Sequence, residues 1–210
     1  MGYDWEKWER RIKYRSDLGG YLYHLTKPEE NEDGKIIMSA LDRLLKIIKE
    51  RKLNGSSTKS GFIMGSKKAI CFQDAPIHGI VQNIVHEQDF RKELGNKVRY
   101  RGIGLAFPKT YIFKSGGRPV FYEKKEIAKN ILPKDEWWRI VNLDLSQNDN
   151  IIDWTHEKEW RLPENEFHFD LSEAVVLLPN RTMYQEFIEE CPLDSLKEIE
   201  GIVQLGPLMY

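Results

Sequence analysis

The chain has 210 residues and an almost balanced charge, with 32 Lys and Arg against 33 Asp and Glu and a formal net charge of -1. A chain of this length can bury a substantial core, and we expect a single domain over residues 1–210 in which residues 1–20 form an N-terminal helical extension. The charge balance argues against nucleic-acid binding by the protein as a whole and leaves only local basic patches for such a role.

Apolar residues that recur at helical spacing predict the helices. The clearest pattern has Ile37, Leu41, Leu44 and Ile48 on one face, with Lys and Glu on the other. The predicted helices cover residues 4–17, 36–50, 77–94 and 183–191.

Runs of β-branched, aromatic and aliphatic residues between turn residues predict the strands. They lie at residues 21–26, 67–76, 102–107, 119–122, 137–143, around 157–159, 174–178 and 202–205. Gly102 and Gly104 fall in one strand, which indicates the close approach of another backbone or a ligand. Helices gather early and strands late without βαβ alternation, so we expect an α+β fold with a mixed or mostly antiparallel sheet.

The cellular context is predicted from features that the sequence lacks. Residues 1–8 have no apolar core of a signal peptide, and no run approaches the roughly 18 apolar residues of a membrane helix. The two cysteines, Cys71 and Cys191, lie in or beside apolar runs and are expected to be buried, reduced thiols. These features predict a cytoplasmic protein without a membrane partner.

An unusual pair of acids stands in the segment 156–161 (HEKEWR). If this segment is a strand, Glu157 and Glu159 point to the same face. Two carboxylates on one face repel each other, and such pairs are kept mainly where they have a function. A second segment, residues 22–26 (LYHLT), is predicted to be a strand that ends in a polar side chain. We expect the two segments to meet in the fold.

Four segments in order resemble the AbiGi-type abortive-infection proteins. They are residues 70–76 (ICFQDAP), 100–109 (YRGIGLAFPK), 119–122 (PVFY) and 157–161 (EKEWR). The chain also resembles a broad uncharacterised bacterial family with a similar E-x-E-W-R segment. AbiGi proteins are generally labelled as phage-defence components, sometimes as the antitoxin of a pair. The resemblance therefore implies a role in antiviral defence or a toxin–antitoxin system.

A more distant resemblance is to ADP-ribosyltransferase-like folds. In that family an early strand carries a His or Arg that holds NAD, a middle strand a polar or aromatic residue, and a late strand the catalytic Glu. His24 with Thr26, Phe72 in residues 70–74, and Glu159 look like these three positions. The E-x-E pair is similar to that of arginine-directed transferases, but the Ser-Thr-Ser triplet that usually accompanies it is absent. The resemblance implies an ADP-ribosyltransferase that uses NAD to modify a macromolecular acceptor, either protein or nucleic acid.

The residues would divide the chemistry as follows. Cleavage of the nicotinamide–ribose bond passes through an oxocarbenium-like cation. Glu159 is expected to stabilise that cation, and Glu157 to accept a proton from the incoming nucleophile. His24 would anchor NAD by hydrogen bonds. Arg99, Tyr100 and Arg101 are second-rank binding candidates, because the basic cluster 97–101 leads into the strand with two glycines and could track a pyrophosphate.

Other interpretations stay open at this level. In a non-catalytic antitoxin or sensor that binds a toxin or phage protein, Glu157 and Glu159 would be structural and could pair with Arg161. A metal-dependent nuclease could use residues 123–125 (EKK). A zinc site is not expected, since Trp160 stands where a zinc-protease helix needs its second His. The basic cluster 10–15 either binds phosphate groups or is a solvated helix face.

Overall fold

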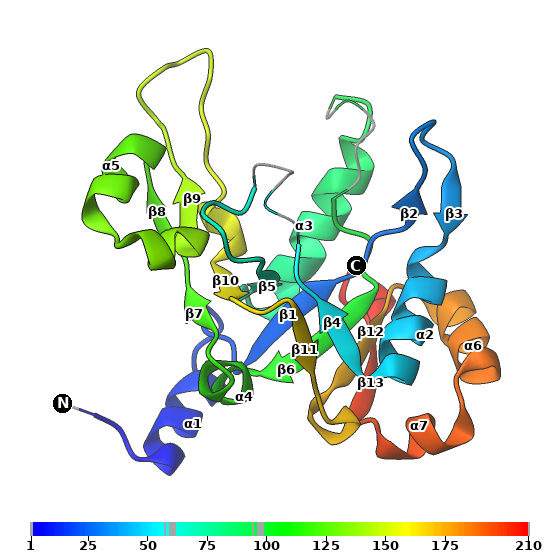
Figure 1. The fold of residues 1–210 in the computed structure, drawn as a ribbon. Coiled ribbons are helices and arrows are strands. Elements are labelled where there is room, and N and C mark those ends of the chain that lie inside the picture. Colours follow the sequence, from blue (N-terminus) through cyan, green and yellow to red (C-terminus); the bar gives the residue numbers. More distant parts are fainter. Residues whose placement is uncertain (1, 57, 59–61, 94, 96–98, 210) are drawn as a thin grey trace.

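A computed structural model describes residues 2–56, 58, 62–93, 95 and 99–209, and it confirms an α+β fold with a mixed, mostly antiparallel sheet (Figure 1). The α-helices are α1 (Trp5–Lys13), α2 (Ala40–Glu50), α3 (Ile77–Asp89), α4 (Lys109–Lys114), α5 (Lys125–Ile131), α6 (Arg181–Glu190) and α7 (Leu193–Glu198). Short 3-10 helices are η2 (Lys134–Arg139), η3 (Thr155–Glu157), η4 (Leu171–Glu173) and η5 (Gly206–Leu208).

A seven-stranded sheet forms the centre of the molecule, in the order β13-β12-β6-β1-β5-β10-β7. Its β12–β13 pair is parallel, and its other pairs are antiparallel. The strands of this sheet are β1 (Tyr21–Leu25), β5 (Ile70–Gln73), β6 (Gly104–Pro108), β7 (Arg118–Pro119), β10 (Glu159–Leu162), β12 (Val175–Leu178) and β13 (Gly201–Gln204). Three small sheets pair β2 (Glu29–Glu30) with β3 (Ile36–Met38), β4 (Lys52–Asn54) with β11 (Glu166–His168), and β8 (Phe121–Glu123) with β9 (Ile140–Asn142).

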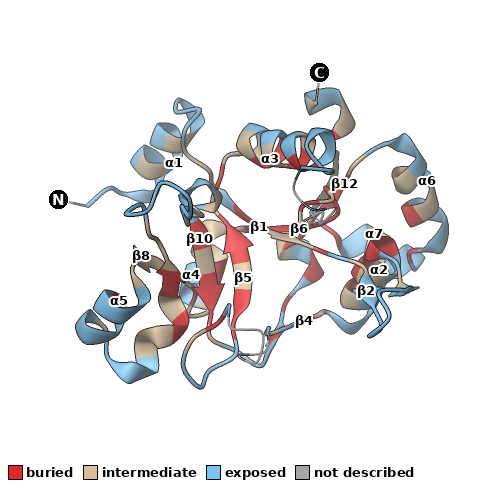
Figure 2. Cartoon of the chain, turned by 90° about the horizontal axis from the view of Figure 1, so that it is seen from above, coloured by how far each residue is buried: buried red, intermediate tan, exposed pale blue. Residues whose placement is uncertain are grey.

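Alternation along the strands builds a core on each face of the sheet. Leu22 and Leu105 belong to one cluster, which includes buried residues of α2 and Phe187 of α6. Their sequence neighbours Tyr23 and Ala106 belong to the other cluster, with residues of α3. Successive side chains of a strand point to opposite faces, so α2 and α3 cover opposite sides of the same strands (Figure 2).

Several predicted boundaries change for local reasons. The helix expected over 36–50 begins at Ala40, because Ser39 caps it: the Ser39 hydroxyl accepts from the Asp42 N–H and the Asp42 carboxylate from the Ser39 N–H. The strand expected over 137–143 is limited to β9, because a 3-10 helix that follows Pro133 extends to Arg139. The helix expected over 77–94 is α3, and residue 94 lies outside the described residues. Helices α4, α5 and α7 were not predicted, since six or seven residues are too few for a periodic pattern.

Within the described part of the chain, no helix has both the length and the apolar character needed to cross a membrane.

Candidate functional site

The three segments that resemble the transferase motifs are hydrogen-bonded neighbours in the sheet. Strand β5 lies between β1 and β10, so the predicted meeting of the first and last segments takes place with one strand between them. The register sets Tyr23 opposite Gln73, and Gln73 opposite Glu159. Residues directly opposite each other share a face, so these three side chains form one row across the sheet.

The prediction that Glu157 and Glu159 lie on one face of the same strand is wrong. Glu157 ends η3, Glu159 begins β10, and Lys158 between them has a left-handed backbone with φ 45°. The turn at Lys158 therefore brings the Glu157 carboxylate towards that of Glu159. The two acids are still close enough that Glu159 contributes to raising the pKa of Glu157.

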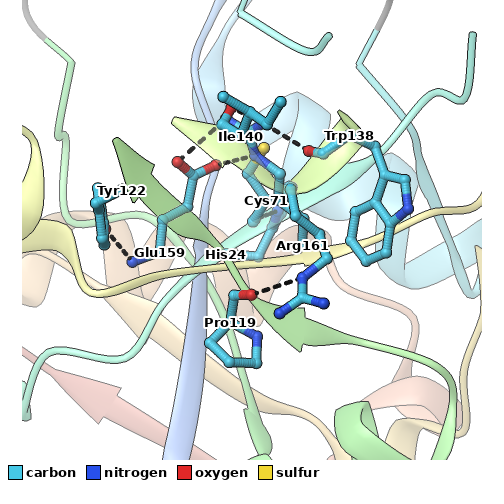
Figure 3. Close-up of polar contacts among 9 residues, drawn as sticks. His24, Cys71, Pro119, Tyr122, Trp138, Ile140, Glu159 and Arg161 are labelled. Carbon is cyan, nitrogen blue, oxygen red and sulfur yellow. Dashed lines mark hydrogen bonds and ion pairs between the residues drawn. The ribbon is translucent and has the colours of Figure 1, made fainter. Parts of the chain in front are cut away.

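Glu159 is fixed by a buried ion pair with Arg161 (Figure 3). Arg161 Nε lies 2.7 Å from Glu159 Oε1, and Nη2 lies 3.3 Å from Oε2. The Arg161 Nη1 group also donates to the carbonyl oxygens of Trp138 and Ile140, at 2.7 and 3.1 Å. The side chains of Glu159 and Arg161 are only 9% and 4% exposed. Each carboxylate oxygen has a second lone pair, so Glu159 keeps acceptor capacity beyond this ion pair.

Glu157 takes part in a chain of polar groups that reaches solvent. The Tyr100 hydroxyl donates to Glu157 Oε1, and its oxygen lies 3.4 Å from Nε2 of the exposed His156. Burial raises the pKa of Glu157, as does the nearby Glu159, while the Tyr100 hydrogen bond lowers it. A half-buried carboxylate with a raised pKa is a better proton acceptor than an exposed one, and Tyr100 and His156 link it to the surface.

His24 lies beside the single register pair that joins β1 to β5. The Tyr23–Gln73 pair is the register contact between these strands, whereas β1 pairs with β6 at five positions. His24 Nδ1 lies 2.9 Å from the Cys71 carbonyl oxygen, so a side chain satisfies this backbone acceptor. A carbonyl can only accept, which places the ring hydrogen on Nδ1 and leaves Nε2 as an acceptor. Burial lowers the pKa of His24 and keeps the ring neutral.

The pleat separates His24 from Glu159. His24 follows Tyr23 in the strand and therefore starts from the opposite face, where its ring lies 5.8 Å from that of Phe72. His24 and Glu159 therefore do not face each other directly. They are connected through Cys71, whose backbone bonds His24 and whose thiol lies beside Glu159 and Arg161 (Figure 3). Burial raises the pKa of this thiol. Of the two cysteines expected to be buried, Cys191 is buried and Cys71 is half-buried.

Two predicted NAD-binding residues are part of the core instead. Phe72 is 1% exposed and packs edge-on against Phe107, with ring centroids 6.2 Å apart. Thr26 is 2% exposed, and its hydroxyl lies 3.2 Å from the carbonyl oxygens of both Ala40 and Ile103. Neither side chain is available to a ligand, because each is occupied by contacts within the protein.

The second-rank candidates divide in the same way. Tyr100 contacts Glu157, as described above, whereas Arg99 is paired with Glu87 at 3.0 Å and lies over the Trp154 ring at 5.0 Å. The Nε atom of Arg101 is buried and has no hydrogen-bond partner among the described residues. The rest of this basic cluster, residues 97 and 98, lies outside the described residues.

Sequence reasoning missed two residues beside the carboxylates. The Tyr122 hydroxyl accepts a hydrogen bond of 2.7 Å from the Glu159 N–H, and burial raises the pKa of Tyr122 to about 12. Gln73 is 9% exposed, and its Oε1 has no partner among the described residues. Buried polar atoms are nearly always paired, so this oxygen is a candidate acceptor for a ligand. Gln73 could have been found by placing residues 70–73 next to 159–162, whereas nothing in the sequence pairs Tyr122 with Glu159.

Two of the three residues of the nuclease interpretation, Glu123 and Lys124, have side-chain contacts within local structure. Lys124 Nζ contacts Asp144 at 3.1 Å and Ser146 at 2.9 Å, and Glu123 accepts from the Lys124 N–H at 2.7 Å. Among the described residues there is no group of three or more His, Cys, Asp and Glu side chains arranged to hold a metal ion.

Comparison with family models, with curated proteins and with solved structures finds no significant match to this chain.

Proposed function

We propose that the protein is an NAD-dependent ADP-ribosyltransferase of the phage-defence or toxin type, with Glu157 and Glu159 at its reaction centre. The observation that carries the proposal is the strand order β1-β5-β10, in which the three motif-like segments are adjacent although they lie far apart in the sequence. An ADP-ribosyltransferase-like arrangement of the sheet is part of this proposal.

Glu159 would stabilise the reacting ribose. When the bond between ribose C1′ and the nicotinamide nitrogen breaks, nicotinamide leaves with the electron pair and positive charge develops on the sugar. A carboxylate that Arg161 already holds in place needs little rearrangement to stabilise this charge. The Gln73 Oε1 atom, which has no hydrogen-bond partner in the part of the chain that the structure describes, lies in the same row of the sheet and would accept a hydrogen bond from a hydroxyl of the sugar.

Glu157 would act as the base. It would take the proton from the nucleophile of the acceptor while that nucleophile bonds to C1′, and the proton could leave through Tyr100 and His156. His24 would support the site from the other side of β5 by holding the Cys71 backbone. This makes His24 a positioning residue in the proposal, in contrast to the direct NAD ligand expected from the sequence.

The test is nicotinamide release from NAD with water as the acceptor, measured for wild type, Glu159→Gln and Glu157→Gln. Loss of the stabilising carboxylate or of the base lowers such rates by about 100-fold or more. Glu164→Gln is the matched control, because Glu164 is exposed on the loop that follows β10. The proposal is rejected if wild type neither binds millimolar NAD nor releases nicotinamide, or if Glu159→Gln reacts as fast as wild type.

A second candidate is a non-catalytic antitoxin or sensor. It is favoured by one observation: both carboxylates already have partners within the chain, Arg161 for Glu159 and Tyr100 for Glu157. In this case no NAD turnover appears with any acceptor, and a toxin or phage protein co-purifies in a stoichiometric amount with wild type and with Glu159→Gln alike.

A further inference from the structure

Helix α1 presents a basic and aromatic face that the proposed reaction centre does not use. We call the six residues that line one open hollow on it the α1 basic face. They are Tyr3, Lys7, Arg10, Arg11, Tyr14 and Arg15. All six are exposed, and the set contains no acidic residue. The spacing from Lys7 through Arg10 and Arg11 to Tyr14 keeps these side chains on one side of the helix.

The opposite side of α1 turns towards the protein. Trp8 and Ile12 are half-buried, and Ile12 Cγ2 lies 3.8 Å from the position that a Cβ on Gly20 would occupy. No residue of α1 is fully buried. The helix therefore projects at the edge of the molecule (Figure 1), and the α1 basic face remains open to a partner.

The ion pairs on this face do not cancel its charge. Lys7 pairs with Asp4 at 2.6 Å and Arg15 with Asp17 at 2.5 Å, but these side chains are between 51% and 67% exposed. Pairs so exposed contribute little and are easily exchanged for a stronger anion. Arg11 is preorganised differently: its guanidinium lies 5.4 Å from the centroid of the Tyr3 ring and donates to the Tyr3 hydroxyl.

From these observations we infer that the α1 basic face binds single-stranded nucleic acid. Four cations in a row match a phosphate backbone, and Tyr3 and Tyr14 at the two ends offer ring faces on which bases stack. A membrane surface fits less well, because the apolar side that would insert includes Trp8 and Ile12, which are half-buried. This inference does not depend on the proposed transfer reaction.

The segment that follows the α1 basic face contacts the turn between the two carboxylates. Lys158, which separates Glu157 from Glu159, donates from Nζ to the Asp17 carbonyl oxygen at 3.1 Å. The segment that follows α1 is thereby tied to the turn carrying the proposed reaction centre.

The experiment is a titration of the full chain with a fluorescently labelled, single-stranded RNA of about 20 nucleotides, followed by anisotropy at several salt concentrations. We expect measurable binding at low salt, weakened at least about tenfold in Arg10→Gln/Arg11→Gln, with the slope of log K against log salt reduced by about 1.4. Tyr14→Ala should weaken binding by about tenfold through lost stacking.

Lys46→Gln/Lys49→Gln removes the same charge from exposed positions of α2 and should bind RNA as wild type does. The inference is overturned if wild type does not bind at low salt, or if this control and the α1 variant lose affinity equally. It is also overturned if anionic phosphatidylserine vesicles capture the protein and RNA does not, with capture lost in Trp5→Ala.

Discussion

At the scale of single residues, the Glu159–Arg161 pair illustrates how burial changes the value of a charge. The two side chains are removed from water, so each depends on the other and on the carbonyls of Trp138 and Ile140 for its polar partners. A buried pair of this kind adds little compared with apolar residues of the same size, but it is costly to break.

We expect Arg161→Met to lower the free energy of unfolding by about 3–5 kcal/mol, because Glu159 is left buried and unpaired. Glu159→Gln in the same background should recover part of the loss, with a coupling energy of about 0.5–3 kcal/mol in the double-mutant cycle. Urea unfolding of the four proteins provides the measurement. Strictly additive single effects would show that the two groups do not interact.

Glu157 should make stability depend on pH in a defined direction. Its pKa in the folded protein is raised above the ordinary 4.5, chiefly by burial, so the folded state binds more protons than the unfolded state just above pH 4.5. Stability from this group is present below pH 4.5 and is lost as pH rises through the raised pKa. We therefore expect Glu157→Gln to gain stability relative to wild type between pH 4 and pH 7, measured by urea titration at each pH. A pH-independent difference would contradict this.

At the scale of elements, the pairing of β1 with β6 depends on a glycine, Gly104. The prediction that another backbone approaches the strand with two glycines is confirmed at Gly104, where a Cβ would lie 2.1 Å from the His24 carbonyl oxygen and 2.8 Å from the Leu25 Cα. Gly102 is favoured for a different reason: its backbone is left-handed, with φ 67°, a conformation that glycine adopts without steric cost. Close contact between β1 and β6 is thus encoded by the missing side chain.

Gly104→Ala is expected to destabilise the protein by about 1–3 kcal/mol or more, since the atoms that the new methyl group meets belong to backbone and cannot move aside. Gly201→Ala on β13 is the matched control: nothing lies within 4 Å of its Cβ position, and its effect should stay within about 0.5 kcal/mol. Equal urea midpoints for Gly104→Ala and wild type would show that β1 and β6 adjust freely.

At the scale of the whole molecule, the described structure divides into a packed body and a projecting N-terminal helix. The body holds a core on each face of the sheet and a smaller buried cluster of Ile63, Ala69 and Trp138, while α1 contributes no fully buried residue. A nine-residue helix is marginal in water by itself. A partner that covers α1 would therefore also stabilise it as a helix.

Removal of residues 1–13 should leave the body folded. We expect a loss below about 1 kcal/mol, which for a chain of this size corresponds to a Tm change within about 4 °C. Thermal unfolding followed by near-ultraviolet circular dichroism tests this. Loss of the cooperative transition would mean that α1 is part of the cooperative unit.

The sequence by itself determined the fold class, the helices α1, α2, α3 and α6, and a close approach at the strand with two glycines, by another backbone or a ligand. These features follow from periodicity and from the missing side chain of glycine, which are local properties. It also gave Glu157 and Glu159 as catalytic candidates and Tyr100 as a second-rank binding candidate, and the structure brings these three residues to one region.

Only the tertiary structure decided which face each side chain occupies. The pleat gives His24 and Glu159 opposite faces, and the left-handed Lys158 moves Glu157 out of the strand. Register also places Phe72 in the core, whereas Thr26 is buried where its hydroxyl contacts the carbonyl oxygens of Ala40 and Ile103. The face of the sheet to which a side chain points depends on strand register, and a register shift of one residue reverses it. Register is set by the pairing of strands that lie far apart in the chain. No local sequence pattern specifies that pairing.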